Sequence, residues 1–125
     1  MIHLDTSVLV DALTGPRRSA AALRKVFERG ERVALSTLVL YEWLRGPRHD
    51  SEVAHQEALF PRDQVQPFGP REATLAADLY RSLSRAQGRE FDLAVAACAL
   101  VSGATLWTLN RADFRDIPRL TLLDE

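Results

Sequence analysis

The sequence predicts an α/β fold in which a parallel sheet of about five strands is sandwiched by helices. Short apolar runs typical of strands alternate with longer segments of helical periodicity. Such alternation favours parallel strands joined by helices that cover both faces of a sheet. The segment 90–102 is also apolar nearly all round, as expected of a buried helix. With 125 residues, residues 1–125 are expected to form a single domain.

In the first half of the chain, turn and capping residues define the element boundaries. The predicted elements are a strand over 1–5, a short helix capped by Thr6 or Ser7, a helix over 17–29, a strand over 32–35 and helices over 36–45 and 50–59. The helix over 17–29 has an apolar face and stops at Gly30. Ser36 is a favourable N-cap for the next helix, which Gly46 and Pro47 end.

The second half continues the alternation. The predicted elements are a strand over 64–68, a long helix that starts at Gly69-Pro70, a helix over 90–102, a strand over 105–109, a helical turn over 111–114 and a strand over 120–123. Proline is tolerated in the first turn of a helix, and Gly88 breaks the long helix before the buried one begins. Gly103 caps the end of the buried helix.

Composition and charge exclude several classes of protein. The chain is 46% apolar and 26% charged, with a formal net charge of -1, so any affinity for nucleic acid must come from a local patch. We find no apolar stretch of the ~20 residues that span a bilayer and no signal-peptide pattern. Cys98 is the only cysteine, which rules out an intrachain disulfide. We therefore expect a cytoplasmic protein.

Four carboxylates each interrupt or end an apolar segment. Asp5 closes the opening apolar run, Glu42 lies among aromatic and aliphatic residues, and Asp92 is the only charge between 91 and 109. Asp113 follows the strand-like run over 104–109 by one tight turn. Burying an ionised carboxylate costs several kcal/mol unless something compensates its charge. Few basic residues stand beside these acids, so the pattern indicates a bound cation.

The predicted topology brings these acids together. Ligands of a parallel sheet bind beyond the carboxyl ends of its strands, and adjacent strands lie about 4.8 Å apart. Oxygen ligands without His or Cys select Mg²⁺ or Mn²⁺, which activate water and neutralise phosphate charge. Thr6, Thr108 and Asn110 lie beside the acids in the sequence and are candidates to orient a ligand or a metal-bound water.

Each acid also has a simpler interpretation. Asp5 could merely cap the next helix, and Glu42 could face solvent on an amphipathic helix. Asp92 could serve only the dipole of its helix, and Asp113 could be a turn residue. The joint pattern favours the metal site over these separate alternatives.

The four acidic segments resemble the sequence blocks of PIN-domain ribonucleases. The blocks are Ile2-His3-Leu4-Asp5-Thr6-Ser7, Glu42-Trp43-Leu44-Arg45-Gly46, Phe91-Asp92-Leu93-Ala94-Val95-Ala96-Ala97 and Thr108-Leu109-Asn110-Arg111-Ala112-Asp113-Phe114. Their order and spacing match across essentially the whole chain, whose length is similar to that of VapC-like toxins of type II toxin–antitoxin pairs. The resemblance implies an endoribonuclease dependent on Mg²⁺ or Mn²⁺, with Asp5, Glu42, Asp92 and Asp113 as catalytic and metal-binding residues. It also implies a homodimer and inhibition by a small antitoxin.

Two other functions were weighed. A phosphotransfer enzyme of the haloacid-dehalogenase type needs a second Asp two residues after the first, where this chain has Ser7. A non-catalytic PIN-like module that binds RNA or protein would have lost one or more acids, whereas this chain keeps all four. If RNA is the substrate, we expect it to approach past the arginines nearest in sequence to the acids. These are Arg45, Arg89 and Arg111.

Overall fold

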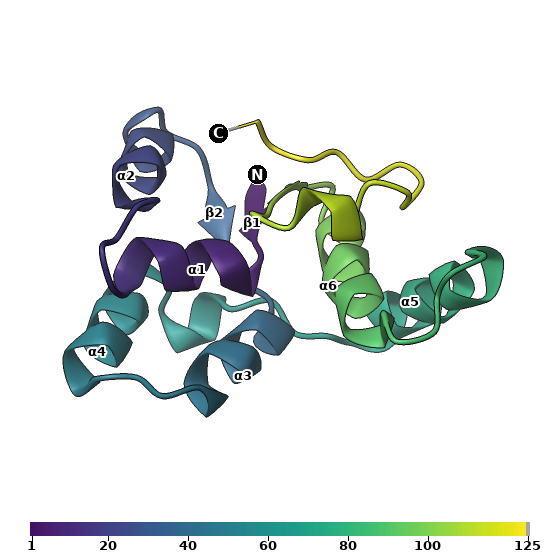
Figure 1. The fold of residues 1–125 in the computed structure, drawn as a ribbon, viewed down its shortest axis with the longest axis horizontal. Coiled ribbons are helices and arrows are strands. Elements are labelled where there is room, and N and C mark those ends of the chain that lie inside the picture. The colour runs from purple at the N-terminus through teal and green to yellow at the C-terminus, as the bar shows by residue number, and fades with distance from the viewer. Residues whose placement is uncertain (125) are drawn as a thin grey trace.

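The centre of the fold is a small parallel sheet. The structure is a computed structural model that describes residues 1–124. Its strands β1 (Ile2–Leu4), β2 (Val33–Ala34) and β3 (Thr105–Trp107) are ordered β2-β1-β3. Both strand pairs are parallel, and Leu4 lies opposite Trp107 at the carboxyl end of the sheet. This arrangement confirms the predicted α/β class (Figure 1).

The sheet has three strands where about five were predicted. The two remaining predicted strands each form a single bridge, between Ser36 and Gln66 and between Leu106 and Leu122. The first cannot extend because Arg62–Gln64 forms the 3₁₀ helix η1 on one side of the bridge, and on the other the partner segment enters α3 (Thr37–Arg45) at Thr37, whose side chain accepts a 3.1 Å hydrogen bond from the Phe68 amide. The second follows Arg119, whose φ of 67° turns the chain just before pairing begins.

Within residues 1–124, six α-helices flank the strands. On one side lie α1 (Thr6–Leu13), α2 (Ala20–Glu28), α3 (Thr37–Arg45) and α4 (Asp50–Leu59), and on the other lie α5 (Pro70–Ser82) and α6 (Glu90–Val101), as Figure 1 shows. Helices α3 and α6 also contact each other, which brings the two sides together at one end of the strands. The predicted sandwich of helices around the sheet is therefore confirmed.

Local chemistry explains where several helices begin. The Ser36 hydroxyl accepts a 3.2 Å hydrogen bond from the Val39 amide and caps α3, as predicted. Helix α2 starts at Ala20 and not at Arg17, because Arg17 has a φ of 54° and lies outside the right-handed helical region. The predicted turn over 111–114 is the 3₁₀ helix η2 (Arg111–Asp113).

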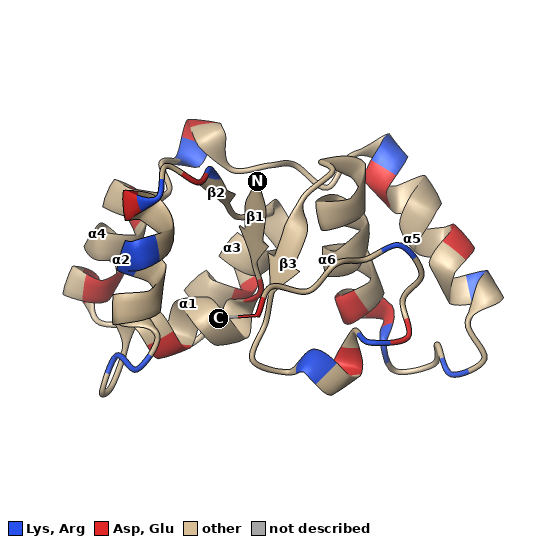
Figure 2. Ribbon diagram, turned by 90° about the horizontal axis from the view of Figure 1, so that it is seen from above, with Lys and Arg blue, Asp and Glu red and all other residues tan. Residues whose placement is uncertain are grey.

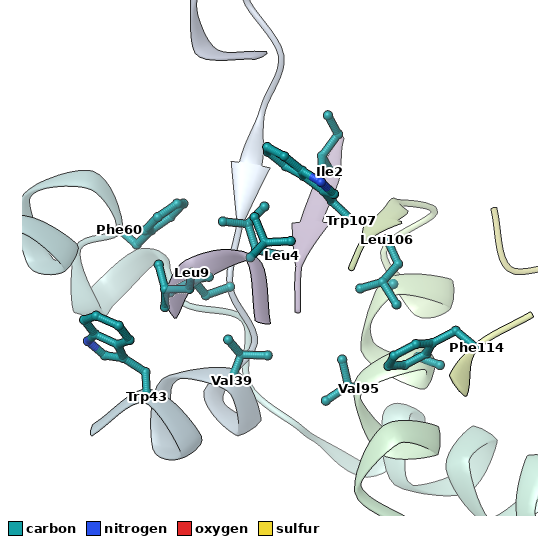
Figure 3. Packing of buried hydrophobic residues seen from close by; sticks show 14 of the residues in the cluster. Ile2, Leu4, Leu9, Val39, Trp43, Phe60, Val95, Leu106, Trp107 and Phe114 are labelled. Atoms are coloured by element: carbon teal, nitrogen blue, oxygen red, sulfur yellow. The ribbon is translucent and has the colours of Figure 1, made fainter. Parts of the chain in front are cut away.

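The core joins both sides of the fold. Trp43, Trp107 and Phe114 are its largest fully buried side chains, and Figure 3 shows them around a continuous set of aliphatic residues from β1, β3 and the helices. Cys98 is buried in the same region, and burial raises the pKa of its thiol to about 11. Within residues 1–124, no helix has both the length and the apolar character needed to cross a bilayer.

Candidate functional site

Asp5 sits where β1 ends and α1 begins. Asp5 occupies the N-cap position of α1, but its side chain makes no capping bond there. Thr6 and Ser7 lie inside the helix, so the prediction that one of them caps it is wrong. Instead, Oδ2 of Asp5 accepts a 2.7 Å hydrogen bond from the Thr108 hydroxyl and a 2.9 Å bond from the Ser7 hydroxyl. The carboxylate, in a residue only 6% exposed, is thus held by two donors from different elements.

A second set of hydrogen bonds supports these two donors. The Leu109 amide donates to Oγ of Ser7 over 3.0 Å, and the Asn110 amide donates to Oγ1 of Thr108 over 3.0 Å. With their oxygens accepting from the backbone, the two hydroxyls can direct their protons to Asp5. Together, the loop after β3 and the first turn of α1 therefore fix the orientation of the Asp5 carboxylate.

Asp5, Glu42 and Asp92 line one cleft of about 440 Å³. Glu42 projects from α3, where its carboxylate lies 3.6 Å from the guanidinium of Arg45 and its side chain is 30% exposed. Asp92 comes from the first turn of α6. The contact between α3 and α6 thus brings two acids from opposite sides of the sheet to the carboxyl end of β1.

The cleft gathers negative charge, and this affects the pKa of Asp92. The pKa of Asp92 is raised from 3.8 to about 6, first by burial and then by the negative charges of Asp5, Asp113 and Glu42. The positive charge of Arg89 lowers it in part. The charges of the three other acids therefore act on Asp92, although the four come from separate segments of the chain.

Asp113 is placed differently from the other three acids. It lies on η2, is exposed and does not line the cleft, yet its charge acts on Asp92. Figure 2 shows the acidic first turn of α6 close to this short helix. The structure thus brings Asp5, Glu42 and Asp92 into one cleft, with Asp113 nearby on a separate loop.

The predicted supporting residues surround the same cleft. Thr6 and Asn110 line it, and Thr108 is buried against Asp5. The hydroxyl of Thr6 is buried and has no hydrogen-bond partner among the described residues. A buried hydroxyl left without a partner is costly, so a ligand in the cleft that accepts its proton would stabilise this arrangement.

The three predicted arginines differ in their surroundings. Arg45 is 61% exposed and pairs with Glu42. Arg89 donates two hydrogen bonds to Asp116, which raise the pKa of the guanidinium and lower that of the carboxyl. Arg111 donates a 2.7 Å bond to the carbonyl of Leu123 and lies 3.2 Å from Asp124.

Three further contacts of the site were not predicted from the sequence: Ser7 as a partner of Asp5, Asp11 as an acid that lines the cleft, and Asp116 as the partner of Arg89. The position of Ser7, two residues after Asp5, allows the first of these contacts. Asp11 accepts a 2.7 Å hydrogen bond from the Ser19 hydroxyl. Nothing in the sequence distinguishes Asp11 from an ordinary surface acid.

The cleft has the donor chemistry of a site for a hard divalent cation. Its charged ligands are carboxylates, with hydroxyl and amide oxygens beside them, the set that Mg²⁺ and Mn²⁺ prefer. Within residues 1–124, no three His, Cys, Asp or Glu side chains are already close enough together to hold a metal ion. Burial and the negative charges of its neighbours raise the pKa of Asp92, and a bound cation would stabilise its ionised form, so the residues fit such an ion.

Comparison with known proteins identifies the family. The model of the PIN domain matches residues 2–120. The chain is 35% identical over 124 residues to ribonuclease VapC19 of Mycobacterium tuberculosis, a match that covers 94% of each chain. In fold it is similar to VapBC2 from Rickettsia felis, solved bound to a promoter DNA fragment, with a TM-score of 0.79, 23% identity and coverage of 100% and 99%.

A toxin–antitoxin complex from Klebsiella pneumoniae has the same fold, with a TM-score of 0.71, 23% identity and coverage of 97% and 96%. At this level of identity, the two solved structures show a shared fold alone. The family match over residues 2–120 and the identity to VapC19 agree with the four acidic blocks. The chain therefore belongs to the PIN-domain family, among its VapC-like members.

Proposed function

We propose that this protein is a divalent-metal-dependent endoribonuclease and the toxin of a type II toxin–antitoxin pair. The observation that carries the proposal is the convergence of Asp5, Glu42 and Asp92 in one cleft, where burial and then the negative charges of its neighbours raise the pKa of Asp92 to about 6. The relative VapC19 is named a ribonuclease, which supports RNA as the substrate.

We assign the cation site to Asp5, Glu42 and Asp92, with Asp113 assisting. A bound Mg²⁺ or Mn²⁺ would supply positive charge at a phosphate and lower the pKa of water. Ser7 and Thr108 hold the carboxylate of Asp5 in one orientation, so it does not have to be ordered when the site is used.

RNA cannot approach the bare cleft easily, because its phosphates would meet the same negative field that acts on Asp92. We therefore expect RNA to bind only when positive charge offsets the acids. Arg45 and Arg111, with side chains 61% and 38% exposed, are our candidates for phosphate contacts. Arg89, the third candidate from the sequence, has a guanidinium already engaged with Asp116.

We also propose a small antitoxin protein as partner and a homodimer as the assembled state. The similar structure from Klebsiella pneumoniae is a toxin–antitoxin complex, which supports the first part. Exposed Tyr41 and Leu44 on α3 and Tyr80 on α5 offer apolar surface for self-association. With cellular RNA as substrate, the site of action would be the cytoplasm. Co-purification with the product of an adjacent small open reading frame tests the partner, and absence of a complex at micromolar concentration counts against it.

Cleavage of total RNA tests the activity directly. Purified protein is incubated with RNA and Mg²⁺ or Mn²⁺, with and without EDTA, beside the isosteric variants Asp5→Asn and Asp92→Asn. Asp63→Asn, an exposed residue of η1, is the matched control. We expect cleavage by the wild type and the control, abolished by EDTA and by either site variant. Metal binding without cleavage of any RNA would favour a non-catalytic binding module.

A further inference from the structure

Arg89 connects the loop before α6 to the loop that carries Asp113 and Asp116. Its Nη1 donates to Oδ2 of Asp116 over 2.8 Å and its Nη2 to Oδ1 over 2.6 Å, a bidentate pair. Nη2 also donates to the backbone carbonyl of Asp113 over 2.8 Å, and Nη1 donates to that of Arg85 over 3.0 Å. The side chain is only 20% exposed. Four hydrogen bonds therefore direct this guanidinium toward protein groups and away from solvent.

The position of Arg89 links two of the acids. Arg89 is the N-cap residue of α6, and its carbonyl accepts the 2.9 Å hydrogen bond from the Leu93 amide that opens the helix carrying Asp92. At its other end, the side chain holds the backbone of Asp113 itself. One residue thus joins the helix that presents Asp92 to the loop that presents Asp113.

We propose that Arg89 and Asp116 form a clamp that sets the position of Asp113 relative to Asp92, and that Arg89 is a positioning residue and not an RNA contact. The proposal rests on the proposed function, because it assigns the clamp a task in the same carboxylate site. Asp92 and Asp113 repel each other, and a loop with only a 3₁₀ helix of three residues has few backbone bonds to resist that repulsion. The clamp supplies three bonds to that loop.

The clamp is not needed to fold the loop. Phe114 and Ile117, 1% and 3% exposed, anchor the same segment in the core. Asp116 is 50% exposed, and ion pairs with such exposed partners contribute little to global stability. Variants of the clamp should therefore remain folded while the geometry around Asp113 loosens.

If Arg89 were instead an RNA contact, the Asp116→Asn variant would change RNA binding in a way that the clamp does not predict. If Arg89 bound phosphate, Asp116→Asn would free its guanidinium and remove a negative charge, so RNA would bind more tightly. If Arg89 positions Asp113, Asp116→Asn would reproduce the defect of Arg89→Gln. The exposed pair Arg81 and Asp78 on α5 has the same chemistry outside the site and provides matched controls, Arg81→Gln and Asp78→Asn.

The experiment compares Arg89→Gln, Asp116→Asn and the double variant with wild type and the two controls. We expect kcat for RNA cleavage and Mn²⁺ affinity to fall about 10-fold in both single variants, a loss typical of residues that orient metal ligands. The double variant should be no worse than either single one, because both remove the same clamp. RNA affinity and its salt dependence should match wild type, and the controls should be unaffected.

Amide hydrogen exchange provides a readout that needs neither metal nor RNA. Exchange over residues 111–117 should accelerate in both clamp variants and in neither control. Tighter RNA binding by Asp116→Asn, or a flattened salt dependence in Arg89→Gln alone, would overturn the clamp. The clamp would also be overturned if the wild type cleaves RNA and the two clamp variants match it in cleavage rate, Mn²⁺ affinity and amide exchange. A wild type that cleaves no RNA would instead overturn the proposed function, while exchange would still report on the clamp.

Discussion

The hydroxyl of Thr108 donates a 2.7 Å hydrogen bond to Oδ2 of Asp5. This contact follows from the register of the sheet. Leu4 lies opposite Trp107 in the parallel pair of β1 and β3, so the next residue of each strand emerges at the same edge. The carboxylate that we propose as a metal ligand and the hydroxyl that orients it are thus placed together by strand pairing, although they are far apart in the sequence.

We predict that Thr108→Val lowers the rate of RNA cleavage about 10-fold, because it removes a hydrogen bond that orients a proposed metal ligand. The loss of a bond to a buried charged group should also reduce the free energy of unfolding by roughly 1.5–3 kcal/mol. Cleavage kinetics and urea unfolding measure the two effects. Thr108→Ser keeps the hydroxyl and should retain most of the activity; wild-type rates in Thr108→Val would contradict this role.

The raised pKa of Asp92 predicts how the metal-free protein responds to pH. A carboxyl with a pKa of 3.8 when unfolded and about 6 when folded favours the folded state at low pH, and that contribution is lost as pH rises through about 6. Asp92→Asn removes the effect. In EDTA at pH 7 the variant should be more stable than wild type by roughly 1–2 kcal/mol, after allowance for solvent screening of this partly exposed group.

Urea unfolding in EDTA between pH 4 and 7 measures this difference. The advantage of Asp92→Asn over wild type should shrink as pH falls and disappear near pH 4, where the folded wild type is protonated at Asp92. Saturating Mg²⁺ or Mn²⁺ at pH 7 should reverse the order, because an ion bound only by folded wild type stabilises it. A stability difference between Asp92→Asn and wild type that does not depend on pH would show that the pKa of Asp92 is not raised in the folded protein.

The exposed arginines near the cleft should contribute to RNA affinity. Replacing Arg45 or Arg111 with Gln should weaken RNA binding and flatten its salt dependence, by roughly 0.7 in the slope of log K against log salt for each lost single-strand contact. Fluorescence anisotropy on the Asp92→Asn background, which should not cleave, measures both quantities. Arg62→Gln on η1 is the control. Unchanged affinity and slope in both site variants would exclude this path for RNA.

The core around β3 should tolerate little change. Leu106 has no exposed surface, and Leu106→Ala should reduce the free energy of unfolding by about 2–5 kcal/mol through lost burial and a residual cavity. Leu44→Ala, at a residue 44% exposed, should change it by less than about 0.5 kcal/mol. Equal losses in the two variants, measured by urea unfolding, would contradict the packing described here.

Elements with strong local signals were predictable from the sequence. Helix α3 begins after Ser36 and ends at Arg45, and α4 spans Asp50–Leu59, both as predicted, because capping residues and Gly-Pro breaks act locally. The strand predicted over 64–68 failed for a different reason. Apolar alternation indicates which residues prefer a strand, but pairing also needs an extended partner, and the segment opposite Gln66 enters α3 at Thr37.

The site was predictable in part for a related reason. Asp5, Glu42 and Asp92 were identifiable because a charge inside an apolar segment requires compensation, whatever the fold. The partners of those acids were not. The contact between Thr108 and Asp5 depends on strand register, and that between Arg89 and Asp116 depends on how a loop returns to a helix. Neither relationship leaves a local signal in the sequence.

The measurement that tests the central claim most directly is calorimetric titration of Mn²⁺ into the wild type, Asp5→Asn, Asp92→Asn and the control Asp63→Asn. If the cleft is one carboxylate site for a divalent cation, the wild type and the control bind Mn²⁺, and each site variant loses at least about 10-fold in affinity. Equal affinity in all four proteins, or no binding by the wild type, would contradict the account.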